Sequence, residues 1–302
     1  MKRTIIGIAS ILLLGFSRSS QAAVTGQWDF NSSNFTATVG ADLADFGVTP
    51  TTFTTATISG GTAVVMGFPA ADLTQGYVMT HGIAPNGGGA YVNQYTLIMD
   101  IMYPTASSGT WRSLFQTQIF NSNDGDLFLN DGNGIGISGN YSGTIQADTW
   151  HRVAFVFDCS LPSNQLKKYI DGTLVGTQNL DSLDGRWAMD PTALLFTDND
   201  GETAAGFVNS IQVHDVPLTD TDIFALGKAT ATGIPTSIPV FTNLNVTVTP
   251  TNQSDVVGMN ATYFSAFAIG SGTYTYQWYR NGSSVAGQTN ASLRMPAVTL
   301  SS

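Results

Sequence analysis

The chain has 302 residues, enough to bury a sizeable core and, by length, to form two domains. Hydrophobic residues make up 42% and charged residues only 11%, and the formal net charge is −10 at pH 7. Nucleic acid and anionic membrane surfaces repel such an acidic protein, so neither nucleic-acid binding nor membrane insertion is expected. The single cysteine, Cys159, excludes an intramolecular disulfide.

Residues 1–22 have the pattern of a secretory signal peptide. Lys2 and Arg3 form the positive start, and the apolar run over 5–16 is too short for a membrane-spanning helix. Ser20-Gln21-Ala22 gives a small-x-small cleavage site. We therefore expect a mature protein that is secreted or held at the cell surface.

The chain continues with short apolar runs separated by Gly, Asn and Asp, a pattern typical of β-strands. Strands are expected at 27–30, 63–68, 76–80, 95–103, 111–117, 126–129, 134–138, 150–158, 167–170, 173–178, 193–196 and 207–214. One helical turn is expected after them, capped by Thr219 and ended by Gly227. A series of strands this long, without a long helical pattern, predicts an all-β, two-sheet sandwich.

The stretch from Thr149 to Gln178 is the most distinctive. Its residues 153, 155 and 157 are apolar at every second position, as a half-buried strand requires, and Asp171-Gly172 predicts a type I′ hairpin turn. The stretch resembles the laminin G-like, concanavalin A-like jelly-roll family, in which a W-H-x-V-A strand pairs with a Y-x-D-G-x-x-V hairpin. The resemblance, extended over 23–228, implies a jelly-roll sandwich. Such folds are mostly used outside cells to bind glycans or proteins, and sometimes to hydrolyse glycans.

The residues after this domain differ in character. Gly, Pro, Ser and Thr without charge predict a linker over 229–238. Residues 239–302 resemble an incomplete immunoglobulin-like β-sandwich of the bacterial type, because 274–282 carries the pattern Y-Q-W-Y-x-N-G, with Trp278 as the core tryptophan. The chain stops where that family has two more strands. We therefore expect Trp278 to lack its main cover, and the chain to be a fragment of a longer protein.

The carboxylates argue against catalysis. Glycan hydrolases of the concanavalin A-like fold use two glutamates on one strand, spaced E-x-D-x-x-E or E-x-D-x-E. This chain contains one glutamate, Glu202, and its most similar strand carries only Asp100. We expect no enzyme activity from this module, although a pair of aspartates assembled from distant loops stays open.

Two acidic loops, 121–126 and 198–202, carry Asp or Asn at alternate positions with a Gly at the turn. This arrangement can present several hard oxygen atoms to one calcium ion. The alternative is that they are ordinary turns in which Asp side chains bind their own backbone. If calcium binds, the expected oxygen donors are Asp198, Asp200, Glu202, Asp124 and Asp126.

Four aromatic residues near predicted loops or strand ends are candidates for stacking on a ligand: Trp187, Trp111, Tyr141 and Tyr91. Trp187 is the strongest of them, and the alternative for each is a place in the core. We expect a secreted, non-catalytic module that recognises a polysaccharide or an extracellular protein, with calcium shaping the binding rim. Two alternatives stay open. One is an accessory region of a larger secreted glycan-active or other hydrolytic enzyme whose catalytic domain lies beyond residue 302, and the other is a structural adhesin stalk.

Overall fold

The computed structural model describes residues 3–5, 8–10, 22–120, 125–239, 245–249, 253–255, 262–269, 276–280 and 283–295. The chain divides into two compact units. The larger is Gln21–Pro239, and the smaller joins Met1–Ser20 to Val240–Ser302. No helix in the described part of the chain combines the length and apolar character needed to cross a membrane.

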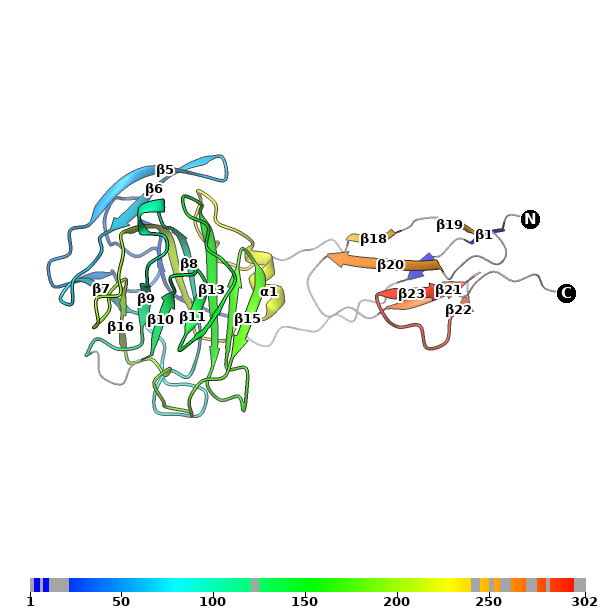
Figure 1. Ribbon diagram of the computed structural model, residues 1–302. Coiled ribbons are helices and arrows are strands. Elements are labelled where there is room, and N and C mark those ends of the chain that lie inside the picture. Colours follow the sequence, from blue (N-terminus) through cyan, green and yellow to red (C-terminus); the bar gives the residue numbers. More distant parts are fainter. Residues whose placement is uncertain are drawn as a thin grey trace. The chain divides into compact units, whose positions relative to one another are not determined.

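The larger unit is built from short strands, one 3-10 turn and one short helix in its described residues (Figure 1). In chain order they are β3 (Val24–Trp28), β4 (Ala44–Phe46), β5 (Thr52–Ile58), β6 (Gly61–Phe68), β7 (Gly76–Thr80), β8 (Gln94–Met102), η1 (Thr105–Ser107), β9 (Arg112–Gln116), β10 (Asp126–Leu129), β11 (Ile135–Ile137), β12 (Asn140–Ser142), β13 (His151–Asp158), β14 (Leu166–Ile170), β15 (Thr173–Gln178), β16 (Thr192–Leu195), β17 (Gly206–His214) and α1 (Asp220–Leu226).

These strands form two antiparallel sheets that pack as two layers (Figure 1). The seven-stranded sheet has the order β12-β11-β10-β9-β16-β7-β4. The eight-stranded sheet has the order β15-β14-β13-β8-β17-β6-β5, with β3 also paired to β17. The predicted all-β, two-sheet architecture is therefore confirmed for the larger unit. The sequence analysis missed β4, β5 and β12, which are short, exposed or rich in Thr.

The main core lies between the two sheets. On β13, the side chains of Val153, Phe155 and Phe157 point into it and pair with residues of β8. The Phe157 ring stacks on Tyr95, with 4.4 Å between the ring centroids. Rings of this size bury large apolar areas, so this cross-strand pair ties the centre of the eight-stranded sheet to the core.

The hairpin between β14 and β15 turns at Asp171-Gly172. Both residues have positive φ, 51° and 81°. A type I′ turn requires positive φ at both positions, which Asp tolerates and Gly adopts freely. The predicted turn is confirmed.

The outer face of β13 is also buried, so the expectation of a half-buried strand was wrong. Ala154 and Val156 lie in a second apolar cluster with the helix residue Ile223 and with Ile234 and Ile238. Figure 1 shows α1 lying against this sheet. Residues 229–238, predicted as a linker, therefore behave as part of the larger unit, because their isoleucines cover apolar side chains on its sheet. We call residues 227–239 the strap.

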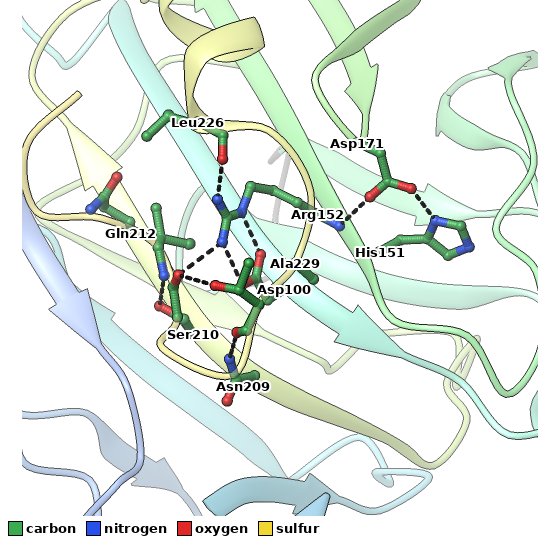
Figure 2. A network of polar contacts seen from close by, with 12 residues as sticks. Asp100, His151, Arg152, Asp171, Asn209, Ser210, Gln212, Leu226 and Ala229 are labelled. Carbon is green, nitrogen blue, oxygen red and sulfur yellow. Dashed lines mark hydrogen bonds and ion pairs between the residues drawn. The ribbon is translucent and has the colours of Figure 1, made fainter. Parts of the chain in front are cut away.

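A buried ion pair fixes the strap (Figure 2). Arg152 on β13 holds both carboxylate oxygens of Asp100 on β8, at 2.7 and 2.8 Å, and both side chains are at most 3% exposed. The same guanidinium donates to the backbone carbonyls of Leu226 and Gly233. Asp100 is the acid on the strand most similar to the hydrolase pattern. Its carboxylate thus has a structural role, because it pairs with the guanidinium that binds the strap.

Helix α1 ends the strand series as expected. The Thr219 hydroxyl accepts a hydrogen bond from the backbone N–H of Asp222, whose carboxylate accepts one from the Thr219 backbone N–H. This reciprocal capping satisfies two otherwise unpaired donors. The predicted cap is confirmed.

The smaller unit contains several short strands in its described residues: β1 (Arg3–Ile5), β2 (Ile8–Ser10), β18 (Asn245–Thr249), β19 (Gln253–Asp255), β20 (Thr262–Ile269), β21 (Gln277–Arg280), β22 (Ser283–Ser284) and β23 (Ser292–Met295). β18, β20 and β23 form one sheet, and β2, β21 and β22 form another.

Trp278 on β21 is only 1% exposed, contrary to the expectation that it lacks cover. It packs with Phe264 and Leu293, and its indole N–H donates to the Asn290 carbonyl at 2.9 Å. The strand edge beside β21 is occupied by β2, from the segment predicted as a signal peptide. The immunoglobulin-like assignment and the signal peptide both stay predictions, and most of 1–22 lies outside the described residues.

Candidate functional site

Three aromatic side chains from separate segments meet outside the main core. Trp111 precedes β9, Phe128 lies on β10 and Tyr141 lies on β12. The Trp111 ring packs edge-on against both others, with centroid distances of 6.0 Å to Phe128 and 5.2 Å to Tyr141. Trp111 and Tyr141 are only partly buried. We call these three residues the aromatic surface.

The strand pattern explains why these rings face away from the core. On β10, Leu127 and Leu129 point into the core, and successive side chains of a strand point to opposite faces. Phe128 therefore points outward. It pairs with Gly136 on β11, which in turn pairs with Tyr141 on β12. The aromatic surface thus lies on the outer face of the seven-stranded sheet, near its β12 edge.

The loop that carries Glu202 lies near these rings. The backbone N–H of Ser113 on β9 donates to the Glu202 carbonyl at 2.7 Å, which holds the 198–202 loop beside the strand. Burial, together with the charges of Asp198 and Asp200, raises the pKa of Glu202. Burial raises the pKa of Tyr141, and the nearby Glu202 charge adds to the effect. The structure therefore places Trp111 and Tyr141, which the sequence analysis predicted to stack on a ligand, near the loop of Glu202, which it predicted to bind calcium.

Asp198 shapes that loop from within. It is 3% exposed, and its Oδ2 accepts hydrogen bonds from the backbone N–H groups of Asp200, at 2.8 Å, and Glu202, at 3.1 Å. This is the turn geometry that the sequence analysis kept as the alternative to calcium binding. One oxygen of the expected metal ligand is thus already used by the backbone.

Among the described residues of the two acidic loops, Asp126 does not join the 198–202 loop. The 198–202 loop lies beside Ser113, whereas Asp126 pairs with Gln116 at the other end of β9 and lies 4.0 Å from the Arg186 guanidinium. Asp124 lies outside the described residues. Within the described ranges, no group of three or more His, Cys, Asp or Glu side chains is placed to hold a metal ion. Calcium stays a prediction.

Trp187 does not fit its predicted role as a ligand contact. It is 5% exposed, belongs to the main core and stacks on Phe157 at 6.0 Å. Its carbonyl accepts a hydrogen bond from the Tyr95 hydroxyl at 2.9 Å. The surrounding Asp-Gly-Arg sequence looks like a loop, but the loop folds its tryptophan inward, because so large a ring gains most by burial.

Phe128 is the residue of the aromatic surface that sequence reasoning missed. It lies in an unbroken Leu-Phe-Leu run, and such a run does not reveal which side chain points outward. A register shift between Leu127 and Phe128 further obscures the pattern.

Residues 83–224, a little under half of the chain, match the family model described as the concanavalin A-like lectin/glucanases superfamily. No curated protein matches the chain. Among solved structures, the chain is similar to domain 4 of AbnA, a GH43 extracellular arabinanase from Geobacillus stearothermophilus, in complex with arabinotriose. The identity is 15% and the TM-score 0.47, and the match covers 68% of this chain and 98% of that one.

The chain is also similar to the binding domain of Paraclostridial Mosquitocidal Protein 1, with 12% identity, a TM-score of 0.48, and coverage of 67% of this chain and 51% of that one. It is similar, too, to the receptor binding domain of botulinum neurotoxin D, with 13% identity, a TM-score of 0.44, and coverage of 67% of this chain and 51% of that one. The match thus spans about half of each toxin chain. At these identities and TM-scores, the similarities assign no function to this chain.

Proposed function

We propose that the larger unit is a non-catalytic module that binds a glycan on the aromatic surface. The observation that carries the proposal is the meeting of Trp111, Phe128 and Tyr141 outside the core, near the loop that carries Glu202. The match of 83–224 to a superfamily of lectins and glucanases supports it. Secretion or display at the cell surface, indicated by residues 1–22, belongs to the same proposal.

Aromatic rings and a carboxylate complement the two sides of a sugar. The apolar C–H face of a sugar ring packs on an aromatic ring, and a partly exposed Trp gives a large and rigid contact area. Hydroxyl groups at the edge of the sugar donate hydrogen bonds to a carboxylate such as that of Glu202. A carboxylate held beside the rings strengthens such bonds, because it is partly shielded from water.

The same geometry favours binding over hydrolysis. Hydrolysis of a glycosidic bond by the usual mechanisms requires two carboxyl groups that flank the bond, one of them free to transfer a proton. The charged groups that act on Glu202 are Asp198 and Asp200 of its own loop. The Asp198 carboxylate is buried and holds backbone N–H groups, and Asp200 is only two residues from Glu202 on the same turn. Asp100 lies on the other sheet, paired with Arg152. We therefore assign Glu202 the role of a hydrogen-bond acceptor.

The test is a glycan array with residues 23–239, followed by titration of any bound oligosaccharide by calorimetry. Trp111→Ala should weaken binding at least tenfold, equivalent to about 1.4 kcal/mol. Tyr141→Ala and Glu202→Gln should weaken it less. Phe224→Ala is the matched control, since this phenylalanine is 52% exposed on α1, against the other sheet, and its loss should leave binding unchanged.

Unchanged affinity in Trp111→Ala, with the protein still folded, would remove the aromatic surface from the function. Release of reducing sugar ends from the bound oligosaccharide would overturn the non-catalytic assignment. If the array shows no bound glycan, and the module binds an extracellular protein unless Trp111 is replaced by Ala, the aromatic surface would be a site for a protein partner. The full-length gene separates a free-standing module, an accessory region of an enzyme and an adhesin.

A further inference from the structure

One end of the eight-stranded sheet is an open strand edge. β5 is the last strand in the order of that sheet, and Figure 1 shows it at the outer margin of the larger unit. Its seven residues pair with β6 in one register without a shift, so the strand is regular over its whole length of about 23 Å. Its exposed side chains are those of Thr52, Thr54, Thr55 and Thr57.

The other ends of the two sheets are protected. β15 carries a register shift in its pairing with β14, and it lies close to β12, because a Cβ at Gly176 would lie 2.3 Å from the Ser142 hydroxyl. β12 and β4, the two ends of the seven-stranded sheet, are each three residues long. Bulges, short edge strands and covered edges are ways in which proteins keep a sheet edge from pairing with another chain. β5 is a longer and regular strand without these protections.

The lack of charge also distinguishes this edge. Residues 46–71, which include β5 and β6, contain no charged side chain, although the chain has a formal net charge of −10. Edge strands that avoid pairing often carry Lys or Pro, and β5 contains neither. Two copies of an acidic protein repel each other through their charged surfaces, so an uncharged strand is where a second copy can approach at least electrostatic cost.

The turn between β5 and β6 determines which backbone groups of β5 are open. Ser59 and Gly60 have positive φ, 48° and 83°, as a two-residue type I′ hairpin requires. Ile58 and Gly61 flank that turn and form a hydrogen-bonded pair, and such pairs alternate with non-hydrogen-bonded pairs along an antiparallel ladder. The residues of β5 whose backbone groups face away from β6 are therefore Phe53, Thr55 and Thr57.

We propose that β5 pairs with β5 of a second copy of this chain, in an antiparallel dimer that places Thr55 opposite the partner's Thr55. The open backbone groups of β5 make no hydrogen bond with a described residue outside the β5–β6 hairpin. In this register Phe53 faces the partner's Thr57, and each pair exchanges two hydrogen bonds. One two-fold axis thus satisfies all the open groups of both copies, and the two eight-stranded sheets become one continuous sheet.

The dimer is expected to be reversible and to leave the aromatic surface open. One strand edge is small compared with the roughly 1,200–2,000 Å² that stable interfaces bury, so pairing should depend on protein concentration. The aromatic surface lies near β12, which approaches β15 at the opposite end of the eight-stranded sheet from β5. If the proposed function holds, the dimer would present two such surfaces to one polymeric glycan and bind it with avidity.

Sedimentation velocity of the full chain over a concentration series measures the pairing, and the wild type should change from monomer to dimer as concentration rises. Thr55→Lys sets like charges opposite each other at the two-fold axis and should weaken association at least tenfold. Thr177→Lys is the matched control, because Thr177 is exposed on β15, and it should leave association unchanged. An equimolar mixture of Thr55→Lys and Thr55→Asp should associate again, because opposite charges then meet.

Amide hydrogen exchange tests the strand edge directly. The amides of Phe53, Thr55 and Thr57 should exchange more slowly at high protein concentration than at low, whereas those of Thr54 and Ala56, which face β6, should be protected at both. Protection of the first three at every concentration would place another segment of the same chain on β5 and overturn the proposal. A wild type that stays monomeric, a dimer that Thr55→Lys leaves intact, or one that both lysine variants weaken equally would overturn it as well.

Discussion

The outer faces of the two sheets differ in how far the chain covers them. The eight-stranded sheet is covered by its own chain, because α1 and the strap bury apolar side chains on it, and Arg152 ties the strap to Asp100. On the outer face of the seven-stranded sheet, aromatic rings gather near the β12 edge and two of them stay partly exposed. The first face contributes stability, and the second carries the proposed binding surface. Changes on the first should therefore alter unfolding, and changes on the second should alter binding.

The largest effect is expected from Arg152→Ala. This change leaves the Asp100 carboxylate buried without its partner and should lower the free energy of unfolding by about 3–5 kcal/mol. Urea denaturation of residues 23–239 measures it. The double variant Asp100→Leu with Arg152→Met should be more stable than Arg152→Ala, because it buries no unpaired charge. An Arg152→Ala protein as stable as the wild type would show that the covered face does not depend on this pair.

The strap is tested by Ile234→Ala. Ile234 is 1% exposed in the outer cluster, so its truncation should cost about 2–5 kcal/mol of unfolding free energy. Thr236→Ala, an exposed position in the same strap, serves as the control and should be neutral. Equal stability of the two variants would restore the sequence prediction of a free linker.

Acid should weaken the covered face through His214. Burial lowers the pKa of this imidazole from 6.5 to about 4, so the folded state stays neutral where the unfolded chain takes up a proton. The unfolded state therefore binds more protons between these values, and stability falls as pH falls from about 6.5 towards 4. The difference in pKa corresponds to a loss of about 3 kcal/mol at most. His214→Gln should show a shallower decline between pH 7 and pH 4.5 than the wild type, and identical slopes would contradict the assignment.

The smallest effect is expected from calcium on the open face. Since Asp198 already holds two backbone N–H groups, the melting temperature should differ by less than about 1 °C between 5 mM calcium and chelator, whereas a site filled at a hundredfold excess over Kd would add about 2.7 kcal/mol. Asp198→Ala should lower stability equally in both buffers, through loss of the turn. A calcium-dependent rise in melting temperature that Asp198→Ala removes would support the predicted metal site.

Local patterns in the sequence determined the parts of the fold that rest on neighbouring residues. The Asp171-Gly172 turn, the Thr219 cap and the limits of β7, β10 and β15 follow from backbone preferences and alternation, which act over a few residues. Three of the named site residues, Trp111, Tyr141 and Glu202, were also found from their residue type.

Only the tertiary structure decided what each of these residues faces. Alternation marks two faces of a strand but not what covers them, so β13 was expected to be half-buried and the strap to be free until Ile223 and Ile234 were seen on it. For the same reason Trp187 was assigned to a ligand and is in the core. The meeting of Trp111 with Tyr141, and the separation of Asp126 from the 198–202 loop along β9, depend on sheet order. Sheet order is set by contacts between residues far apart in the chain.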